Sequence, residues 1–244
     1  MLHKTALRGA AVAATLLMVT AAPALALPNL VADGTFPAGS FAGWTYTSTS
    51  NVNSQAVVIK TDGVARSYPT GAYGQGIPND TLTTGSPDLS AGYAAYFSTD
   101  TGSQTLSQTL SLVVGRYSIG FDVFVPSNGY NNPNDATFTG SIAGTALFSS
   151  ASVATIGTTD GVNKWVTVQS IADVMTAGVY TVKFTFAGTV APAKDILVNR
   201  VFVTGGAIFS GGTQTPVPEP GALALLAGAA ALLAGVRRRN AASR

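Results

Sequence analysis

Regular alternation of large and small residues in three separate stretches constrains the fold of this chain more than any other feature of its sequence. Large, mostly apolar residues occupy every second position in 106–112, 117–125 and 180–186, and small polar residues or lysine fill most positions between them. Successive side chains of a strand point to opposite faces, so a period of two with one apolar face indicates an antiparallel strand buried on one side. Phe124 interrupts the polar face of the second stretch.

Turn residues separate these stretches, and no segment between residues 27 and 215 has a strong helical period. Gly115 and Gly178 each open an alternating stretch, and we interpret them as equivalent positions in two sheets. Charged residues make up only 10% of the chain, far below the usual quarter. We therefore predict an all-β fold, with short antiparallel strands arranged as a two-sheet sandwich.

The first 26 residues have the three parts of a secretory signal peptide. Lys4 and Arg8 precede an apolar run over residues 9–22, and Ala24-Leu25-Ala26 is a small-x-small cleavage site. We predict export through the Sec pathway and cleavage after Ala26. A cut after Ala24 is the less favoured alternative because it would place a proline inside the recognition site.

A proline motif, an apolar run and a basic stop follow one another at the C-terminus. Pro218-Glu219-Pro220 precedes the apolar residues 221–236, and Arg237-Arg238-Arg239 comes directly after them. As a helix, the apolar run would span about 24 Å at 1.5 Å per residue, less than the roughly 30 Å of a hydrocarbon core. We predict a weak transmembrane helix whose arginines stay in the cytoplasm.

In order and spacing this tail resembles the PEP-CTERM sorting signal of surface and exported proteins in Gram-negative, polysaccharide-producing bacteria. The resemblance implies an exosortase-type membrane protease as a partner, which would process the protein near Pro218-Glu219-Pro220. It also implies an inner-membrane tether facing the periplasm, followed by transfer to the cell surface or the extracellular matrix. An ordinary single-pass tail anchor is the alternative.

The residues between the two ends exclude several kinds of function. We predict one domain over 27–209, a Gly/Thr/Pro linker over 210–217 and the sorting segment over 218–244. Without both ends the chain is mildly acidic, which gives no electrostatic basis for binding nucleic acid. There is no Cys, His3 is the only His, and Glu219 is the only Glu. The domain therefore cannot hold a Ser-His-Asp triad, a Cys–His pair or a His-ligated zinc.

A second resemblance covers scattered parts of the domain. Residues 29–36, followed by Gly43-Trp44, resemble the opening strand of galactose-binding-like jelly rolls, a fold of many extracellular carbohydrate-binding modules. Residues 106–117 resemble the middle strands of that fold, and residues 197–203 the closing strand. The resemblance implies an antiparallel jelly-roll β-sandwich.

Members of that family often bind a structural calcium through an acid after the first-strand Phe and an aspartate near the last strand. Here those places carry Pro37, and Asn199 with Arg200. Calcium needs six to eight oxygen ligands, and an arginine would repel it. We expect no cofactor, and a calcium site of this type is the alternative.

Two stretches are too long for simple turns and contain candidate sugar-binding residues. An exposed tyrosine ring can cover the apolar face of a sugar while neighbouring amides meet its hydroxyls. The alternative is local turn chemistry, because Asn, Asp, Gly and Pro are what turns need. The candidates are Tyr68 and Tyr73 in the stretch 62–88, and Asn128, Tyr130, Asn131, Asn132 and Asp135 in the stretch 127–135.

Other conspicuous residues favour structural roles. Trp44 and Trp165 begin predicted strands, so we expect them in the core rather than on the surface as sugar platforms. A glycosidase needs two carboxyls about 5 to 10 Å apart across a cleft, and no motif brings together any two of Asp100, Asp122, Asp160 and Asp195.

These observations favour a non-enzymatic protein of the cell surface or biofilm matrix that associates with extracellular polysaccharide. The polysaccharide is implied by the family resemblance. Two alternatives stay open: a structural or adhesive coat protein without a specific ligand, and an Asp-dependent polysaccharide-modifying enzyme.

Overall fold

The computed structural model describes residues 27–50, 55–66, 75–88, 92–207, 209–210 and 213–214, with side chains described up to residue 205. These residues belong to a compact unit that spans Ala26–Val217. The predicted signal peptide and sorting segment lie outside the described residues. Within the described ranges, no helix is long and apolar enough to span a membrane.

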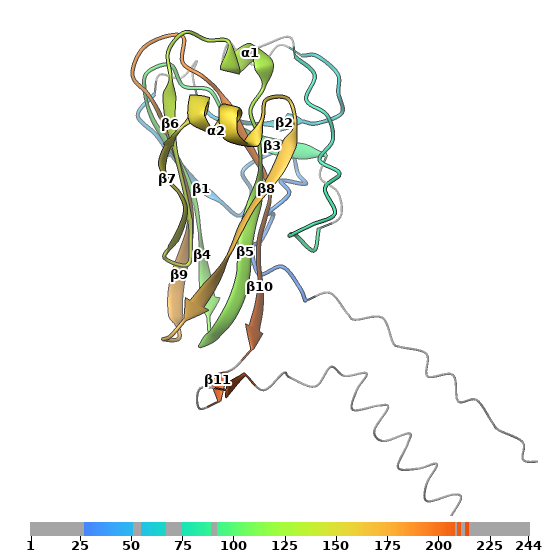
Figure 1. Cartoon of the computed structure of the whole chain (residues 1–244), viewed down its shortest axis with the longest axis vertical. Helices are drawn as coiled ribbons and strands as arrows, with labels where there is room; N and C mark the ends of the chain where they lie inside the picture. Colours follow the sequence, from blue (N-terminus) through green and yellow to red (C-terminus); the bar gives the residue numbers. More distant parts are fainter. Residues whose placement is uncertain are drawn as a thin grey trace, which may run out of the picture. The chain divides into compact units, whose positions relative to one another are not determined.

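Two five-stranded antiparallel sheets face each other (Figure 1). The first has the order β1-β4-β9-β6-β7, with β1 (Thr45–Ser48), β4 (Gly102–Leu112), β9 (Gly178–Gly188), β6 (Ala136–Ile142) and β7 (Thr145–Ser152). The second has the order β2-β3-β10-β5-β8, with β2 (Val57–Lys60), β3 (Tyr93–Phe97), β10 (Ile196–Ala207), β5 (Gly115–Phe124) and β8 (Trp165–Val174). The fold is an antiparallel jelly-roll β-sandwich, which confirms the predicted fold class.

Two of the strands begin where the sequence pattern places them. Gly115 opens β5 in one sheet, and Gly178 opens β9 in the other. β4 pairs with β9 along its whole length, with Leu106 opposite Phe184. Because alternate residues share a face, this register directs the large residues of both strands into the space between the sheets.

Phenylalanines dominate the core between the two sheets. Phe121 from β5 packs edge-on against Phe184 from β9, with ring centroids 4.8 Å apart. Phe97, Phe138 and Phe186 extend this cluster and are fully buried. Trp44 also lies in the core, as predicted, with 8% of its surface exposed.

The outer face of the second sheet is covered as well. The segment 75–88 packs over it, and a second hydrophobic cluster fills the space with Ile77, Phe124, Trp165 and Leu197 among its members. This cover explains why Phe124 interrupts the polar alternation of β5, since its ring faces a second core rather than water. Trp165 is 8% exposed, which confirms the prediction that it is buried.

Two local predictions were wrong. The segment 29–36 is not an opening strand, because Asp33 and Phe36 adopt positive φ angles of 51° and 52° and the chain turns there. A helix, α2 (Val153–Asp160), was not predicted. Its Thr and Gly residues are poor helix formers, and the Ser152 side chain caps it by accepting a hydrogen bond from the Thr155 N–H at 3.2 Å.

Two further short elements lie in stretches that we predicted as loop or linker. A single helical turn, α1 (Ser127–Tyr130), begins the stretch 127–135. After β10, β11 (Phe209–Ser210) pairs with β12 (Thr213–Gln214), so the start of the predicted linker folds back on itself as a small hairpin.

Candidate functional site

Tyr130 is half-buried and packs within the fold, so it is not the exposed platform that the sequence suggested. Its ring packs against Gly157 of α2, where an added Cβ would lie 2.5 Å from the ring. The Lys194 ammonium lies over the ring, 4.6 Å from its centroid. The Tyr130 hydroxyl pairs with Thr158 at 3.1 Å. These contacts make Tyr130 a residue that joins α1 to α2.

Two other candidates of this stretch also hold the backbone in place. Asn132 donates a hydrogen bond to the Ala193 carbonyl at 2.5 Å. Asp135 accepts from the Ala154 N–H at 3.0 Å and from the Ser152 hydroxyl, and so supports the start of α2. Asn128 and Asn131 are exposed. Sugar binding by this stretch stays a prediction.

The structure brings the two predicted loop stretches together. Gln75, from the first stretch, accepts hydrogen bonds from the Ser127 hydroxyl and the Asn128 N–H, both at 3.0 Å. Its amide donates to Asn163, which also accepts from the Ser127 N–H at 2.9 Å. Tyr68 and Tyr73 lie outside the described residues.

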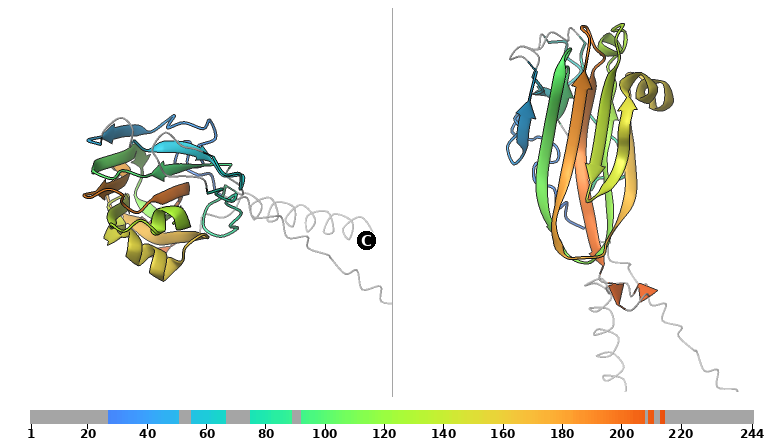
Figure 2. Two further views of the ribbon diagram at one scale, coloured as in Figure 1. Left: turned by 90° about the horizontal axis from the view of Figure 1, so that it is seen from above. Right: turned by 90° about the vertical axis from the view of Figure 1, so that its left-hand side faces the viewer.

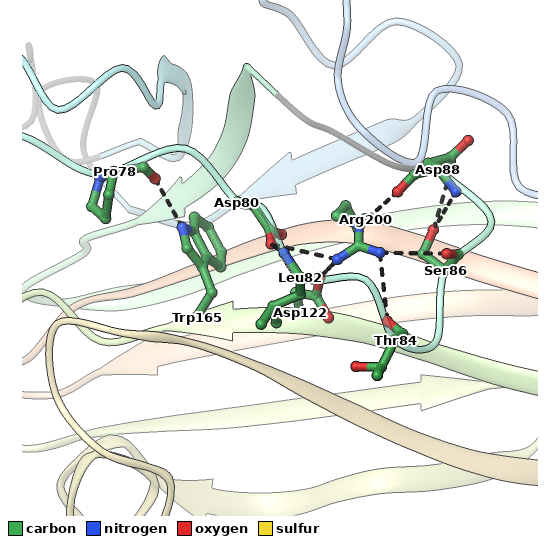
Figure 3. Close-up of polar contacts among 9 residues, drawn as sticks. All are labelled: Pro78, Asp80, Leu82, Thr84, Ser86, Asp88, Asp122, Trp165 and Arg200. Carbon is green, nitrogen blue, oxygen red and sulfur yellow. Dashed lines mark hydrogen bonds and ion pairs between the residues drawn. The ribbon is translucent and has the colours of Figure 1, made fainter.

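A buried arginine organises the cover of the second sheet (Figure 3). The Arg200 guanidinium contacts the Asp122 carboxylate at 2.8 Å and the Asp80 carboxylate at 3.5 Å, and all three side chains are 0% exposed. It also donates to the carbonyls of Thr84, Ser86 and Asp88, at 3.5, 3.4 and 2.8 Å. One side chain of β10 therefore holds five acceptors, four of them in the covering segment 75–88.

The backbone of β10 is distorted to place this arginine. Arg200 has a φ of 43° and lies where the pairing of β10 with β5 shifts register, between Asn199 and Phe202. A residue with positive φ at a bulge redirects its side chain and costs backbone energy. The ion pairs and hydrogen bonds of Arg200 offset that cost.

Arg200, at the place where the family resemblance would imply a calcium-binding aspartate, is thus a buried cation of the chain itself. Burial, together with the neighbouring Asp80, raises the pKa of Asp122 to about 7 despite the contact with Arg200. Two carboxyls share one guanidinium, so one of them retains its proton more readily than a free aspartate. Among the described residues, no group of three or more His, Cys, Asp or Glu side chains could hold a metal ion.

A second buried acid lies beneath α1. Asp195 is 2% exposed and accepts a hydrogen bond from the Tyr96 hydroxyl at 2.8 Å. Gly129 lies against it, and an added Cβ there would be 2.4 Å from the carboxyl oxygen. Burial raises the pKa of Asp195 to about 7, and the charge of Asp100 adds to this rise. Because Asp122 and Asp195 are both sealed from solvent, neither is open to a substrate.

We expect the free energy of unfolding to fall as pH rises from about 4 to about 7. The Asp195 pKa is raised from 3.8 to about 7 in the folded state. The folded protein therefore holds more protons than the unfolded chain over this range, and a rising pH removes them at the expense of stability. The Asp195→Asn variant should flatten the slope, as measured by urea melts at several pH values.

The control for this experiment is Asp173→Asn. Asp173 is exposed at the surface, and its pKa is lowered by the hydrogen bond from Arg116. Its contribution to the pH dependence of stability therefore has the opposite sign, and solvent weakens it. This control should keep the decline of stability with pH. An unchanged slope in Asp195→Asn would show that the buried carboxyl does not titrate in this range.

The outward face of the first sheet is an ordered array of hydroxyl groups. Thr47 lies opposite Thr105, Thr105 opposite Thr185, and Thr185 opposite Thr139, so four threonines form a row across β1, β4, β9 and β6. The hydroxyls of Thr105 and Thr185 are 3.4 Å apart. The right-hand view of Figure 2 looks onto this face, and no described element crosses it.

A second row runs beside the first and carries the only charge of this face. Thr45, Ser107, Lys183 and Ser141 lie opposite one another across the same four strands. Lys183 is the only charged residue within the five strands of the first sheet, and none of the acidic residues falls within them. The face is therefore polar, rich in hydroxyls and weakly positive.

The fold and this face define the chain as a jelly-roll β-sandwich with one covered sheet and one open, hydroxyl-rich sheet. No protein-family model matches the chain, and no curated protein matches it significantly.

Solved structures with a similar fold have low sequence identity. TmCBM61 in complex with β-1,4-galactotriose is 14% identical, with a TM-score of 0.38, over 72% of this chain and 97% of that chain. The enzymatically active domain of tailspike protein 4 from bacteriophage CBA120 is 13% identical, with a TM-score of 0.44, over 72% of this chain and 21% of that chain. A carbohydrate-binding module from the β-sandwich superfamily is 13% identical, with a TM-score of 0.39, over 77% of this chain and 64% of that chain. At these values the likenesses say nothing about a ligand, and the function has to be inferred from the chain's own surface.

Proposed function

We propose that the protein is a non-enzymatic module that binds polysaccharide through the outward face of β1, β4, β9 and β6. The row of Thr47, Thr105, Thr185 and Thr139 supports this proposal most directly. Hydroxyl groups both donate and accept hydrogen bonds, so a row of them is complementary to the hydroxyls of a sugar polymer.

The spacing of the array suits a repeating ligand. Neighbouring strands lie about 4.8 Å apart, and alternate residues of one strand are separated by about 6.7 Å. Four strands therefore present hydroxyls over about 14 Å, the width of three strand spacings. A single hydrogen bond contributes only about 0.5 to 1.5 kcal/mol, so useful affinity requires several contacts at once, as a polymer supplies.

The charge of the face limits the class of polysaccharide. Lys183 lies in the second row, between Ser107 and Ser141, and no acid occurs on the five strands. A lysine among hydroxyls favours a carboxylate or sulfate on the ligand. We therefore infer an acidic polysaccharide as the preferred ligand and a cationic one as disfavoured.

The double variant Thr105→Val/Thr185→Val is expected to weaken binding of an acidic polysaccharide about tenfold, which corresponds to two hydrogen bonds of ordinary strength. Valine has nearly the shape of threonine and suits strands equally well, so the fold should be retained. Binding of the full chain to an immobilised polysaccharide panel, measured by surface plasmon resonance, tests this expectation.

Two matched controls, Thr83→Val and Lys60→Gln, lie outside the array. Thr83→Val changes an exposed threonine in the segment that covers the other sheet and should leave binding unchanged. Lys183→Gln should weaken binding of the acidic ligand and reduce its salt dependence, whereas Lys60→Gln, in β2 of the other sheet, should do neither. Full affinity in the double valine variant, or equal losses in the controls, would refute this location of the site.

Other results would favour the alternatives. If no glycan on the panel binds the wild-type chain, a coat protein without a specific ligand becomes the better interpretation. Turnover of any polysaccharide would support the Asp-dependent enzyme, although the buried positions of Asp122 and Asp195 offer it no support.

The cellular location of this module is proposed from the termini alone. The signal peptide 1–26 supports export, and the Pro218-Glu219-Pro220 motif with the apolar run 221–236 supports a membrane tether and exosortase processing. An extracellular module that binds acidic polysaccharide would fit a surface or matrix protein of this kind.

A further inference from the structure

One end of the sandwich carries exposed apolar side chains in and beside two connections that cross from one sheet to the other. Val113, between β4 and β5, is 56% exposed, and Met175, between β8 and β9, is 75% exposed. Val179, near the start of β9, is 73% exposed. We call these three residues the apolar tip.

The strand register places the two connections beside each other and beside the end of β10. Leu112 lies opposite Gly178 in the first sheet, and Gly115 lies opposite Val174 in the second. Ala207, the last residue of β10, lies opposite Arg116. Figure 1 shows the ends of β4, β5, β8, β9 and β10 together at the lower end of the domain. The apolar tip therefore lies at the end of the domain from which the chain continues toward its C-terminus.

The composition of these two connections is unusual for turns exposed to water. Turns are normally rich in Asn, Asp, Gly, Pro and Ser, as the stretch 127–135 at the other end of the domain is. The connections here read Leu-Val-Val-Gly over 112–115 and Met-Thr-Ala-Gly over 175–178. The nearest charges, Arg116 and Asp173, neutralise each other in an ion pair at 2.8 Å.

We propose that the apolar tip inserts into the interfacial layer of a lipid bilayer and so orients the domain on the membrane to which its C-terminus is tethered. Exposed apolar groups at one end of a domain mark an interaction surface, and apolar side chains without net charge suit the boundary between headgroups and acyl chains. This inference rests on the proposed membrane tether and goes beyond the proposed binding of polysaccharide. It concerns one end of the domain, where Val179 lies at the margin of the outward face of β9.

The length of the chain beyond β10 supports a lipid partner. Only residues 208–220 separate Ala207 from the apolar run 221–236, and they can span at most about 45 Å. Pairing of β11 with β12 shortens this connection further. Since β4, with eleven residues, is about 36 Å long, the opposite end of the domain lies one strand length farther from the point of attachment. The apolar tip is thus the end of the domain nearest the point of attachment.

The absence of cysteine from the sequence allows a direct test with the full chain. Single cysteines at Val113, Met175 and Val179 are labelled with an environment-sensitive fluorophore, and each variant is reconstituted in vesicles of zwitterionic lipid with or without nitroxide-labelled lipid. The matched control is Val190→Cys, because Val190 is also an exposed valine, at 53%, but follows the other end of β9. All four changes are at exposed positions, so the fold should be retained.

Labels at the apolar tip are expected to show blue-shifted emission and several-fold stronger quenching by nitroxide lipid than the label at Val190, without dependence on salt. Equal quenching at all four positions would overturn the proposal. Shielding of the tip labels that grows with the protein-to-lipid ratio, without lipid quenching, would overturn it in favour of contact with a second copy of the chain.

Discussion

Replacing Arg200 with methionine is expected to lower the free energy of unfolding by about 3–5 kcal/mol, as is typical when one partner of a buried ion pair is removed. Arg200, Asp80 and Asp122 are all 0% exposed. Without the guanidinium, two carboxyls stay buried with no cation, and the carbonyls of the covering segment lose their donor. Chemical denaturation followed by tryptophan fluorescence measures the loss.

An exposed arginine provides the matched control for this variant. Arg116 also pairs with an aspartate at 2.8 Å, but its side chain is 47% exposed. Solvent screens such pairs, so Arg116→Met should leave stability nearly unchanged.

Removal of the acids distinguishes a lost ion pair from lost packing. The triple variant Arg200→Met/Asp80→Asn/Asp122→Asn should recover part of the stability that Arg200→Met loses, because no net charge is then left uncompensated in the interior. If Arg200→Met is as stable as the wild type, the guanidinium does not hold the cover of the second sheet.

Replacing Trp165 with alanine is expected to lower the free energy of unfolding by about 3–5 kcal/mol, the usual result of emptying a large aromatic site. The ring is 8% exposed and packs on Phe124 with centroids 5.1 Å apart. Its indole N–H donates to the Pro78 carbonyl at 2.9 Å. The same denaturant melts, followed by circular dichroism because a tryptophan is lost, measure the effect.

Two companion variants define what the indole contributes. Trp165→Phe keeps a ring but loses the hydrogen bond to Pro78. Its free energy of unfolding should therefore lie between those of the wild type and the alanine variant. Val179→Ala removes an exposed apolar side chain and should change stability by no more than about half a kcal/mol. A loss below about 1 kcal/mol for Trp165→Ala would contradict the burial of this ring and favour a surface role.

The two large effects should also be coupled. Arg200 and Trp165 both hold the segment 75–88, Arg200 through the carbonyls of Thr84, Ser86 and Asp88 and Trp165 through the carbonyl of Pro78. Once the first substitution loosens this segment, the second substitution removes fewer of the contacts that stabilise it. The free energy of unfolding of the double variant is therefore expected to fall by less than the sum of the two single losses.

The strands and their class were predictable from the sequence because their signal is local. The alternation in 106–112, 117–125 and 180–186 specifies which side chains share a face, and the structure forms β4, β5 and β9 there. The burial of Trp44 was predicted from its place at the start of a strand, whereas Trp165 is buried by the segment that covers the outer face of the second sheet. The helix α2 was missed because its cap and its packing against Tyr130, rather than helix propensity, stabilise it.

The role of Arg200 had a weak sequence signal that could not be interpreted alone. It is a single charge within the apolar closing run 197–203, which indicates a special position but not its partners. Asp122 and Asp80 lie 78 and 120 positions earlier in the chain. Contacts over such separations are set by which strands pair and by what covers the sheet, and neither is encoded in a local period.

The candidate site shows the same limit. The sequence by itself determined that Thr185, in the alternating stretch 180–186, lies between large residues and so faces away from the core. Only the tertiary structure decided that it forms one row with Thr47, Thr105 and Thr139, because the order β1-β4-β9-β6 and its register bring together residues from four distant segments. A slip of one residue in any pairing would turn those hydroxyls inward, and burial of the phenylalanine core on the opposite face is what prevents that slip.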